Sequence, residues 1–259
     1  MQLSKRLTAV ADMVSNGNRL VDVGTDHGYI PIFLVENGQV PSAIALDINK
    51  GPIQRAKEHI LEHNLEKYIE TRLSDGVTAL NANEGDTLVI AGMGGGLIIK
   101  IITQGEEILS NFIEFVLQPQ SEIEQVRKFI IEKGYNIVEE NMILDEGKYY
   151  PMMKVTKNYK STSEYRENNI NNRKSNDESL LYQERNASSY NNIIFYKYGK
   201  NLLKNKNATL KLFLEKELNT YTGISEKLSA NAQENARIRI KEIKDEINYI
   251  KEALLFYEM

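Results

Sequence analysis

The sequence predicts an α/β protein in which a mainly parallel, seven-stranded sheet is followed by a helical C-terminal domain. Over residues 1–155, short apolar segments typical of buried strands alternate with helical segments, and this alternation favours a parallel sheet with right-handed crossovers. From residue 194 onwards, apolar residues recur at spacings of three and four. That period is typical of long helices that pack side by side.

The first domain, residues 1–155, contains all the predicted strands. They cover 19–23, 43–47, 68–73, 86–91, 114–118, 135–141 and 149–155. The predicted helices cover 3–15, 29–36, 50–64, 97–102 and 123–133. Pro119 is expected to end the fifth strand. The last two strands should pair antiparallel across a turn at 145–147.

The rest of the chain has a different composition. Nine of the 38 positions from 156 to 193 are Asn, so this segment is predicted to be a flexible insertion or linker, with short helical pieces as the alternative. Residues 194–259 are predicted to form an antiparallel coiled coil of two helices. The turn between them is expected at 229–235, and Gly223 is a second possible break.

The net charge of −4 conceals an asymmetry between the two parts of the chain. Residues 1–150 contain 13 Lys and Arg against 22 Asp and Glu, whereas residues 151–259 contain 19 against 14. The acidic part suits a small cationic cofactor. The basic part suits an anionic polymer such as RNA, although a solvated, lysine-rich helical surface would look the same.

Composition also limits where the protein can act. The chain has no Cys, which excludes a disulfide framework and a thiolate metal site. No apolar run approaches the roughly 20 residues that a membrane-spanning helix needs. We therefore expect a soluble, cytoplasmic protein with no membrane partner. The sequence does not determine its oligomeric state, for which a monomer is favoured.

The turn after the first predicted strand is the most informative segment. Asp22 lies at the end of that strand, and Gly24 and Gly28 flank Thr-Asp-His. A dinucleotide-binding turn has the pattern G-x-G-x-x-G, but here Asp26 stands where a second glycine would approach a pyrophosphate. A carboxylate would repel a diphosphate and tolerate a cation. The turn therefore favours S-adenosylmethionine, which carries a sulfonium and no phosphate, over NAD or ATP.

Further candidate cofactor contacts follow the next three strands. Asp47 can accept hydrogen bonds from both ribose hydroxyls, because a carboxylate has two acceptor oxygens. The turn at 74–76 suits the adenine amino group. The glycine-rich turn at Gly92 and Met93 allows a flat ring to approach the main chain, and it has no side chain to accept an amino proton. The predicted cofactor contacts are Asp22, Gly24, Thr25, Gly28, Asp47, Ile48, Ser74, Asp75, Gly76, Gly92 and Met93.

One further motif, His59-Ile-Leu-Glu-His63, matches an inverted zinc-protease pattern. We interpret it as an exposed helical surface, because its helix follows the acid assigned to the ribose and should lie away from the strand ends. No metal ion is therefore expected.

Several segments resemble the bacterial tRNA (adenine-22 N1)-methyltransferase family. They are Leu-Ser-Lys-Arg-Leu at 3–7, Val-Gly-Thr-Asp-His-Gly-Tyr-Ile-Pro at 23–31, Ile-Ala-Gly-Met-Gly-Gly at 90–95 and Leu-Gln-Pro at 117–119. Gln120 departs from the Leu-Gln-Pro-Asn form of the family. The resemblance covers residues 1–155, and it implies a Rossmann-like class I methyltransferase with a C-terminal coiled coil. It also implies S-adenosylmethionine as donor and N1 of a tRNA adenine as acceptor.

The residues are compatible with that chemistry. Neutral adenine N1 has an in-plane lone pair and no proton, so it needs no strong base, and orientation alone can lower the barrier by roughly 7–11 kcal/mol. The product is a cation, which Asp26 is predicted to stabilise. His27 and Tyr29 are predicted to hold or stack on the adenine after it leaves its own stack.

Two alternatives remain open. One is a methyltransferase acting on another RNA position or on a small molecule, although a compact substrate would not need the basic helical part. The other is a non-catalytic RNA-binding module, against which the intact Asp22, Asp47 and Asp75 argue.

Overall fold

The computed structural model describes residues 1–157, 192–230 and 236–258. The chain divides into two compact units, residues 1–162 (unit 1) and residues 163–259 (unit 2). Nearly all of the segment predicted to be a linker, 156–193, lies outside the described residues.

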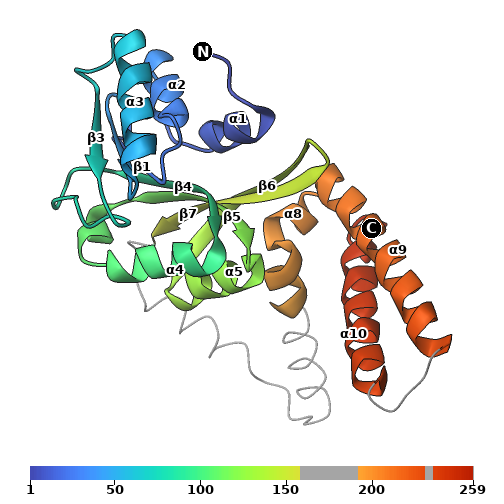
Figure 1. Ribbon diagram of the computed structural model, residues 1–259. Coiled ribbons are helices and arrows are strands. Elements are labelled where there is room, and N and C mark those ends of the chain that lie inside the picture. The colour runs from blue at the N-terminus through green and yellow to red at the C-terminus, as the bar shows by residue number, and fades with distance from the viewer. Residues whose placement is uncertain (158–191, 231–235, 259) are drawn as a thin grey trace. The chain divides into compact units, whose positions relative to one another are not determined.

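Unit 1 is built around one seven-stranded sheet with the order β3-β2-β1-β4-β5-β7-β6 (Figure 1). The strands are β1 (Leu20–Val23), β2 (Ala43–Asp47), β3 (Ile69–Leu73), β4 (Thr87–Gly94), β5 (Glu114–Ser121), β6 (Tyr135–Asp145) and β7 (Lys148–Lys157). Strands β1 to β5 are parallel, and β7 pairs antiparallel with both β5 and β6. The mainly parallel sheet with an antiparallel closing pair is therefore confirmed.

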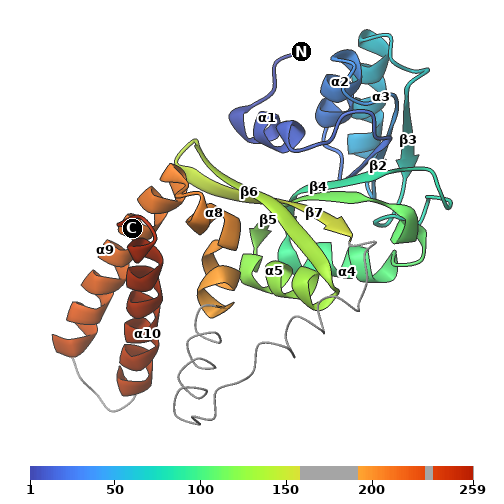
Figure 2. The same ribbon diagram turned by 180° about the vertical axis from the view of Figure 1, so that it is seen from behind.

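Helices cover both faces of this sheet (Figures 1 and 2). They are α1 (Lys5–Asp12), α2 (Tyr29–Glu36), α3 (Lys50–Glu62), α4 (Gly95–Gln104), the short 3-10 helix η1 (Ile108–Asn111) and α5 (Ile123–Glu132). Val89 packs in the core beneath α1, α2 and α3, whereas its neighbours Leu88 and Ile90 pack beneath α4 and α5. A strand whose successive side chains enter two cores must be apolar throughout, which explains the unbroken apolar run in β4.

Several element ends differ from the prediction. Strand β4 runs to Gly94 rather than ending at residue 91, so the predicted glycine-rich turn at Gly92 and Met93 is the irregular last part of that strand. Strand β5 does not end at Pro119 but runs to Ser121, so that expectation is wrong. Beyond Leu117, β5 pairs only with β4, and a strand with one free edge tolerates the missing N–H of proline. Helix α1 ends at Asp12 rather than at residue 15.

The turn predicted between the last two strands is confirmed as a two-residue connection. Glu146 and Gly147 have positive φ angles of 48° and 78°. This conformation matches the right-handed twist of antiparallel strands, and β6 and β7 form a long hairpin whose register shifts between Ile137 and Glu139.

The strand order places a topological reversal at β1. Strand β1 lies between β2 and β4, so the direction of chain progression reverses there. In open α/β sheets, ligands bind beyond the carboxyl ends of the strands at this reversal. The turns after β1, β2, β3 and β4 all lie at that edge.

Unit 2 is helical. It contains a helix at 192–198, α8 (Lys200–Lys204), α9 (Ala208–Ala230) and α10 (Ala236–Leu255). Helices α9 and α10 lie side by side and antiparallel (Figures 1 and 2), and their contact buries Leu210, Leu214, Ile243 and Ile250. Helix α9 continues through Gly223 without a break. The supercoiling expected of a coiled coil stays a prediction.

Candidate active site

The loop after β1 is fastened to the ends of β2 and β4. The backbone N–H groups of Gly24 and Thr25 both donate to the carbonyl oxygen of Leu46, at 2.8 and 2.9 Å. On the other side, a Cβ atom at residue 24 would lie 2.1 Å from the Cε atom of Met93. Gly24 also has a φ of +76°. The positive φ favours glycine here whatever the space, whereas the Met93 methyl group is the end of a flexible side chain that can move.

The ends of β2 and β3 are joined in the same way. The Ser74 N–H donates to the carbonyl oxygen of Asp47 at 2.8 Å. One carboxylate oxygen of Asp47 accepts from the Asn49 N–H at 2.7 Å, which leaves the other available to a ligand. Beside it, the apolar side chain of Ile48 is 60% exposed. This surface suits a nucleoside, with polar contact for a ribose and apolar contact for a base.

The turn at 74–76 is stabilised internally. The Ser74 hydroxyl donates to the Gly76 carbonyl at 2.9 Å and accepts from the Ala79 N–H at 3.1 Å. This hydroxyl therefore shapes the turn and is not free for a ligand. Asp75 is exposed, so of the predicted residues here it offers the accessible carboxylate.

Asp22 is the buried acid of the site, with 5% of its surface exposed. Burial raises the pKa of Asp22 to about 6, the Thr25 hydroxyl opposes this rise, and the charge of Asp47 adds to it. The Thr25 hydroxyl is buried and makes no full hydrogen bond within the described residues. Two acids so placed without a cation create a site that favours a positively charged ligand.

Asp26 differs from Asp22 because 76% of its side chain is exposed. Its Oδ1 atom lies 3.3 Å from Nε2 of His27 and 3.8 Å from Nη2 of Arg55. The structure thus brings Asp26 beside His27, as expected for one loop. It also shows that a second basic side chain, from α3, shares the charge of this carboxylate.

Three rings gather at the start of α2. The rings of His27, Tyr29 and His59 are nearly parallel, with centroids 5.1–5.4 Å apart. His27 has a left-handed φ of 61°, which is uncommon for a residue other than glycine. Its Nδ1 atom is buried and has no hydrogen-bond partner among the described residues. Such strain and an unsatisfied ring nitrogen are typical of functional loops.

The interpretation of His59 as an exposed residue far from the strand ends is wrong. Nδ1 of His59 lies 3.0 Å from the carbonyl oxygen of His27, so the N–H tautomer can donate to that loop. Arg55 and His59 are four residues apart and share one face of α3. His63 instead contacts Glu36 at 3.0 Å. In the part of the chain that the structure describes, no group of His, Cys, Asp and Glu could hold a metal ion.

The sequence did not single out Arg6 as a site residue. Arg6 reaches the irregular last part of β4, at Gly92. Its Nη1 atom donates to Oε1 of Gln118 at 2.9 Å, and its guanidinium lies 5.7 Å from the centre of the Tyr150 ring. The same Nη1 atom is 3.4 Å from where a Cβ atom at Gly92 would stand. The predicted turn at Gly92 and Met93 is thus bordered by a cation.

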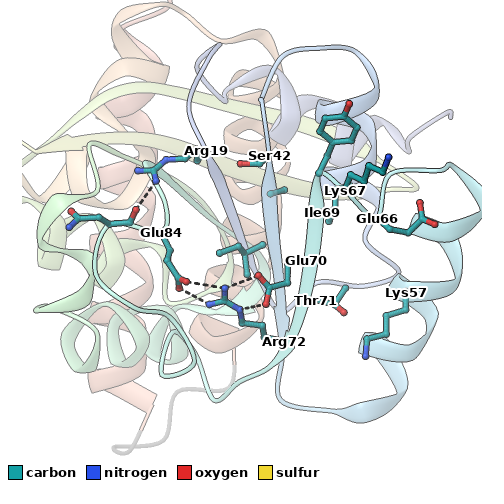
Figure 3. Close-up of a pocket in the computed structure, with 14 residues that line it drawn as sticks. Arg19, Ser42, Lys57, Glu66, Lys67, Ile69, Glu70, Thr71, Arg72 and Glu84 are labelled. Atoms are coloured by element: carbon teal, nitrogen blue, oxygen red, sulfur yellow. Dashed lines mark hydrogen bonds and ion pairs between the residues drawn. The ribbon is translucent and has the colours of Figure 1, made fainter.

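A separate pocket of about 730 Å³ lies beside β3, and none of the predicted cofactor contacts lines it (Figure 3). Arg72 lies between Glu70 and Glu84 there, with closest contacts of 2.6 Å to each. The Arg72 guanidinium holds the pKa of Glu84 down at about 2. These charges satisfy one another, so the edge at the strand ends is the better candidate site.

Comparison with known proteins agrees with this geometry. Residues 3–153 match the methyltransferase-domain family, so the chain is a methyltransferase-domain protein. It is 29% identical over 255 residues to the tRNA (adenine(22)-N(1))-methyltransferase of Bacillus subtilis, an alignment that covers 98% of each chain. Among methyltransferases, the chain belongs to the tRNA (adenine-22 N1)-methyltransferase family.

Two solved structures support this assignment. One is a candidate tRNA (m1A22) methyltransferase from Streptococcus pneumoniae in complex with S-adenosyl-L-methionine, with 30% identity and a TM-score of 0.73 over 98% of this chain and 100% of that chain. The other is M. capricolum TrmK in complex with S-adenosyl-homocysteine, with 25% identity and a TM-score of 0.75 over 99% of each chain.

Replacing Asp22 with Asn should stabilise the ligand-free protein at pH 8, by on the order of 1–3 kcal/mol. Because the folded-state pKa of Asp22 is raised to about 6, the wild type loses stability as the pH rises from about 4 to about 6. The variant lacks this titration. Urea denaturation at pH 4 and pH 8 measures the difference, which should vanish at the lower pH.

The same variant should bind S-adenosylmethionine more weakly, since it lacks the charge that faces the donor. If Asp22→Asn were instead less stable than the wild type at pH 8, the Asp22 carboxylate would have stabilising partners in the ligand-free protein, and the prediction would be wrong.

Proposed function

We propose that the chain transfers the methyl group of S-adenosylmethionine to N1 of adenine 22 in tRNA and thereby forms 1-methyladenosine. The observation that carries this proposal is the buried Asp22 beside Asp47 at the strand reversal, in a chain aligned over almost its whole length with an enzyme named for this reaction. We place the activity in the cytoplasm, with tRNA as the partner.

The described residues fit the donor. Asp22 lacks a cation, and the buried polar atoms of Thr25 and His27 lack partners. Gly24 and Gly28 have positive φ angles and carry no side chain where the loop begins and ends. When bound, S-adenosylmethionine supplies a methyl group on a positively charged sulfur.

Each strand end has a distinct role in this proposal. Asp22 holds the amino end of the donor, and Asp47 accepts from the ribose hydroxyls. Ile48 and the turn at 74–76 contact the adenine. Gly92 and Met93 form the surface that contacts the face of the acceptor adenine.

The acceptor side favours attack by a ring nitrogen. Gly92 and Met93 carry no group that could accept a proton from an exocyclic amine, and neutral adenine N1 needs none. The residues of the chain therefore act by orientation, which can lower the barrier by roughly 7–11 kcal/mol. His27 and Tyr29 stack on the displaced adenine, and Asp26 offsets the positive charge of the product.

Nucleosides from tRNA that has been incubated with the enzyme and S-adenosylmethionine should contain 1-methyladenosine. Mass spectrometry under conditions that avoid rearrangement to the N6 isomer identifies the product. An adenine-22 to guanine tRNA should remain unmethylated. N6-methyladenosine or methylguanosine as the first product would contradict the proposed acceptor atom.

Asp26→Asn should lower the single-turnover rate by about three- to tenfold, or roughly 1 kcal/mol, with little change in donor affinity. The effect is small because Asp26 is exposed and shares its charge with His27 and Arg55. Rapid-quench assays with saturating tRNA measure the rate. Glu62→Gln, an exposed change on α3, serves as control, and equal rates for both variants would remove Asp26 from the mechanism.

Unit 2 offers a surface for the tRNA backbone. Lys241, Lys244 and Lys251 are exposed, and their spacing of three and seven places them on one face of α10. No acidic partner of these lysines lies within 4 Å among the described residues. In contrast, Lys211 on α9 lies 3.8 Å from Glu215. Unpaired ammonium groups along one helix face are suited to neutralise successive phosphates.

Changing Lys241, Lys244 and Lys251 together to Gln should weaken tRNA binding and reduce the slope of log K against log salt by about two to three, as expected for that many lost phosphate contacts. Filter binding at several salt concentrations measures the slope. Donor affinity should not change. Lys211→Gln is the matched control. A triple variant with the wild-type slope would exclude this face of α10.

A further inference from the structure

We propose that Arg6 binds an oxyanion at the methyl-transfer site. Building on the proposed function, two oxyanions are available there: the carboxylate of the donor and a phosphate of the substrate RNA. Both present the same chemistry to a guanidinium, whose planar fork matches two oxygens at once.

The guanidinium of Arg6 lacks an acidic partner. Arg6 is partly buried, yet among the described residues its side chain contacts only the neutral Gln118 amide and the Tyr150 ring. The nearby Asp145 accepts from the Arg6 backbone N–H at 3.3 Å and forms no ion pair with the guanidinium. Charges withdrawn from water are ordinarily paired, so an external anion is the missing partner.

Other arginines of unit 1 show what a satisfied guanidinium looks like in this fold. Arg127 is buried and pairs with Glu140 at 2.7 Å. Arg19 pairs with Asp86 at 2.8 Å. These pairs are complete within the chain, whereas Arg6 has donors left for a ligand.

Arg6 is held in a fixed direction. Gln118 is fully buried, and its amide nitrogen donates to the Pro119 carbonyl at 3.3 Å, so its oxygen faces Arg6. The Ser4 hydroxyl accepts from the Leu7 N–H at 3.2 Å and caps α1, which fixes the turn that carries Arg6. A donor that is already oriented loses less entropy when it binds an anion.

The guanidinium points at the reacting region. Gly92 has a φ of +81° and no side chain, and a Cβ atom there would meet Nη1 of Arg6 at 3.4 Å and Nε2 of Gln120 at 3.5 Å. Arg6 therefore lies beside Gly92, and the next residue, Met93, contacts Gly24 in the loop after β1.

The test compares the wild type with Arg6→Gln, Arg6→Lys and Lys5→Gln. Lys5 is the exposed neighbour of Arg6 on α1 and serves as matched control. Calorimetry measures binding of S-adenosyl-homocysteine and of its decarboxylated analogue. Filter binding measures the salt dependence of tRNA affinity, and thermal melting verifies that each variant is folded.

If the donor carboxylate is the oxyanion, Arg6→Gln should weaken S-adenosyl-homocysteine about tenfold or more and leave the analogue unaffected, with Arg6→Lys between them. If an RNA phosphate is the oxyanion, donor binding should not change, and the salt slope should fall by about one in Arg6→Gln and be retained in Arg6→Lys.

Wild-type values of both quantities in folded Arg6→Gln would overturn the proposal. Should Arg6→Gln not fold, Arg6→Met, which keeps much of the side-chain length without the charge, replaces it: wild-type affinity for S-adenosyl-homocysteine together with the wild-type salt slope in folded Arg6→Met would overturn the proposal. The two proposals can fail separately. If Arg6→Gln weakens S-adenosyl-homocysteine but not its decarboxylated analogue, and the wild type leaves tRNA unmethylated, this inference stands and the proposed function is refuted.

Discussion

The backbone conformation of the loop after β1 is the constraint on which the site depends. Gly24 has a φ of +76°, a conformation that a side chain would strain. The N–H groups of Gly24 and Thr25 both donate to the carbonyl oxygen of Leu46, near the end of β2. The same loop carries His27, whose carbonyl oxygen lies 3.0 Å from Nδ1 of His59 on α3. One glycine in a left-handed conformation thus fixes how the loop meets β2 and α3.

The sequence predicted the parts of the molecule that depend on local patterns. The apolar run of β4 and the acids near the ends of β1 and β2 lie where expected, because a strand buried on both faces must be apolar and ligands of such a sheet bind at its strand ends. The extension of β5 past Pro119 was not predictable, since it depends on which neighbour β5 pairs with at that point.

The surroundings of the site were predicted less completely, for the same reason. His59 contacts a residue 32 positions away, and Arg6 contacts one 112 positions away. Neither pairing leaves a periodic trace in the sequence. The sequence shows that Arg55 and His59 lie four residues apart and so share one face of α3. Only the folded structure shows that this face contacts the loop after β1.

Charge pairing is more informative than net charge in this protein. Within the acidic N-terminal part, Asp22 stands out because burial raises its pKa to about 6. In the helical unit, Lys197 and Lys211 have acidic partners. Lys241, Lys244 and Lys251 on α10 differ from these two, because no acidic partner lies within 4 Å of them among the described residues. The pairing of individual charges, rather than the net charge, therefore distinguishes one helix face from another.

The ion cluster beside β3 has a consequence for self-association. Strand β3 is an edge of the sheet, and an unpaired edge is a template on which another chain can add a strand. Glu70 and Arg72 project from this strand and, with Glu84, form a charged bridge there. Charged side chains on an edge strand disfavour such addition, so Glu70 and Arg72 make β3 a poorer template for another strand.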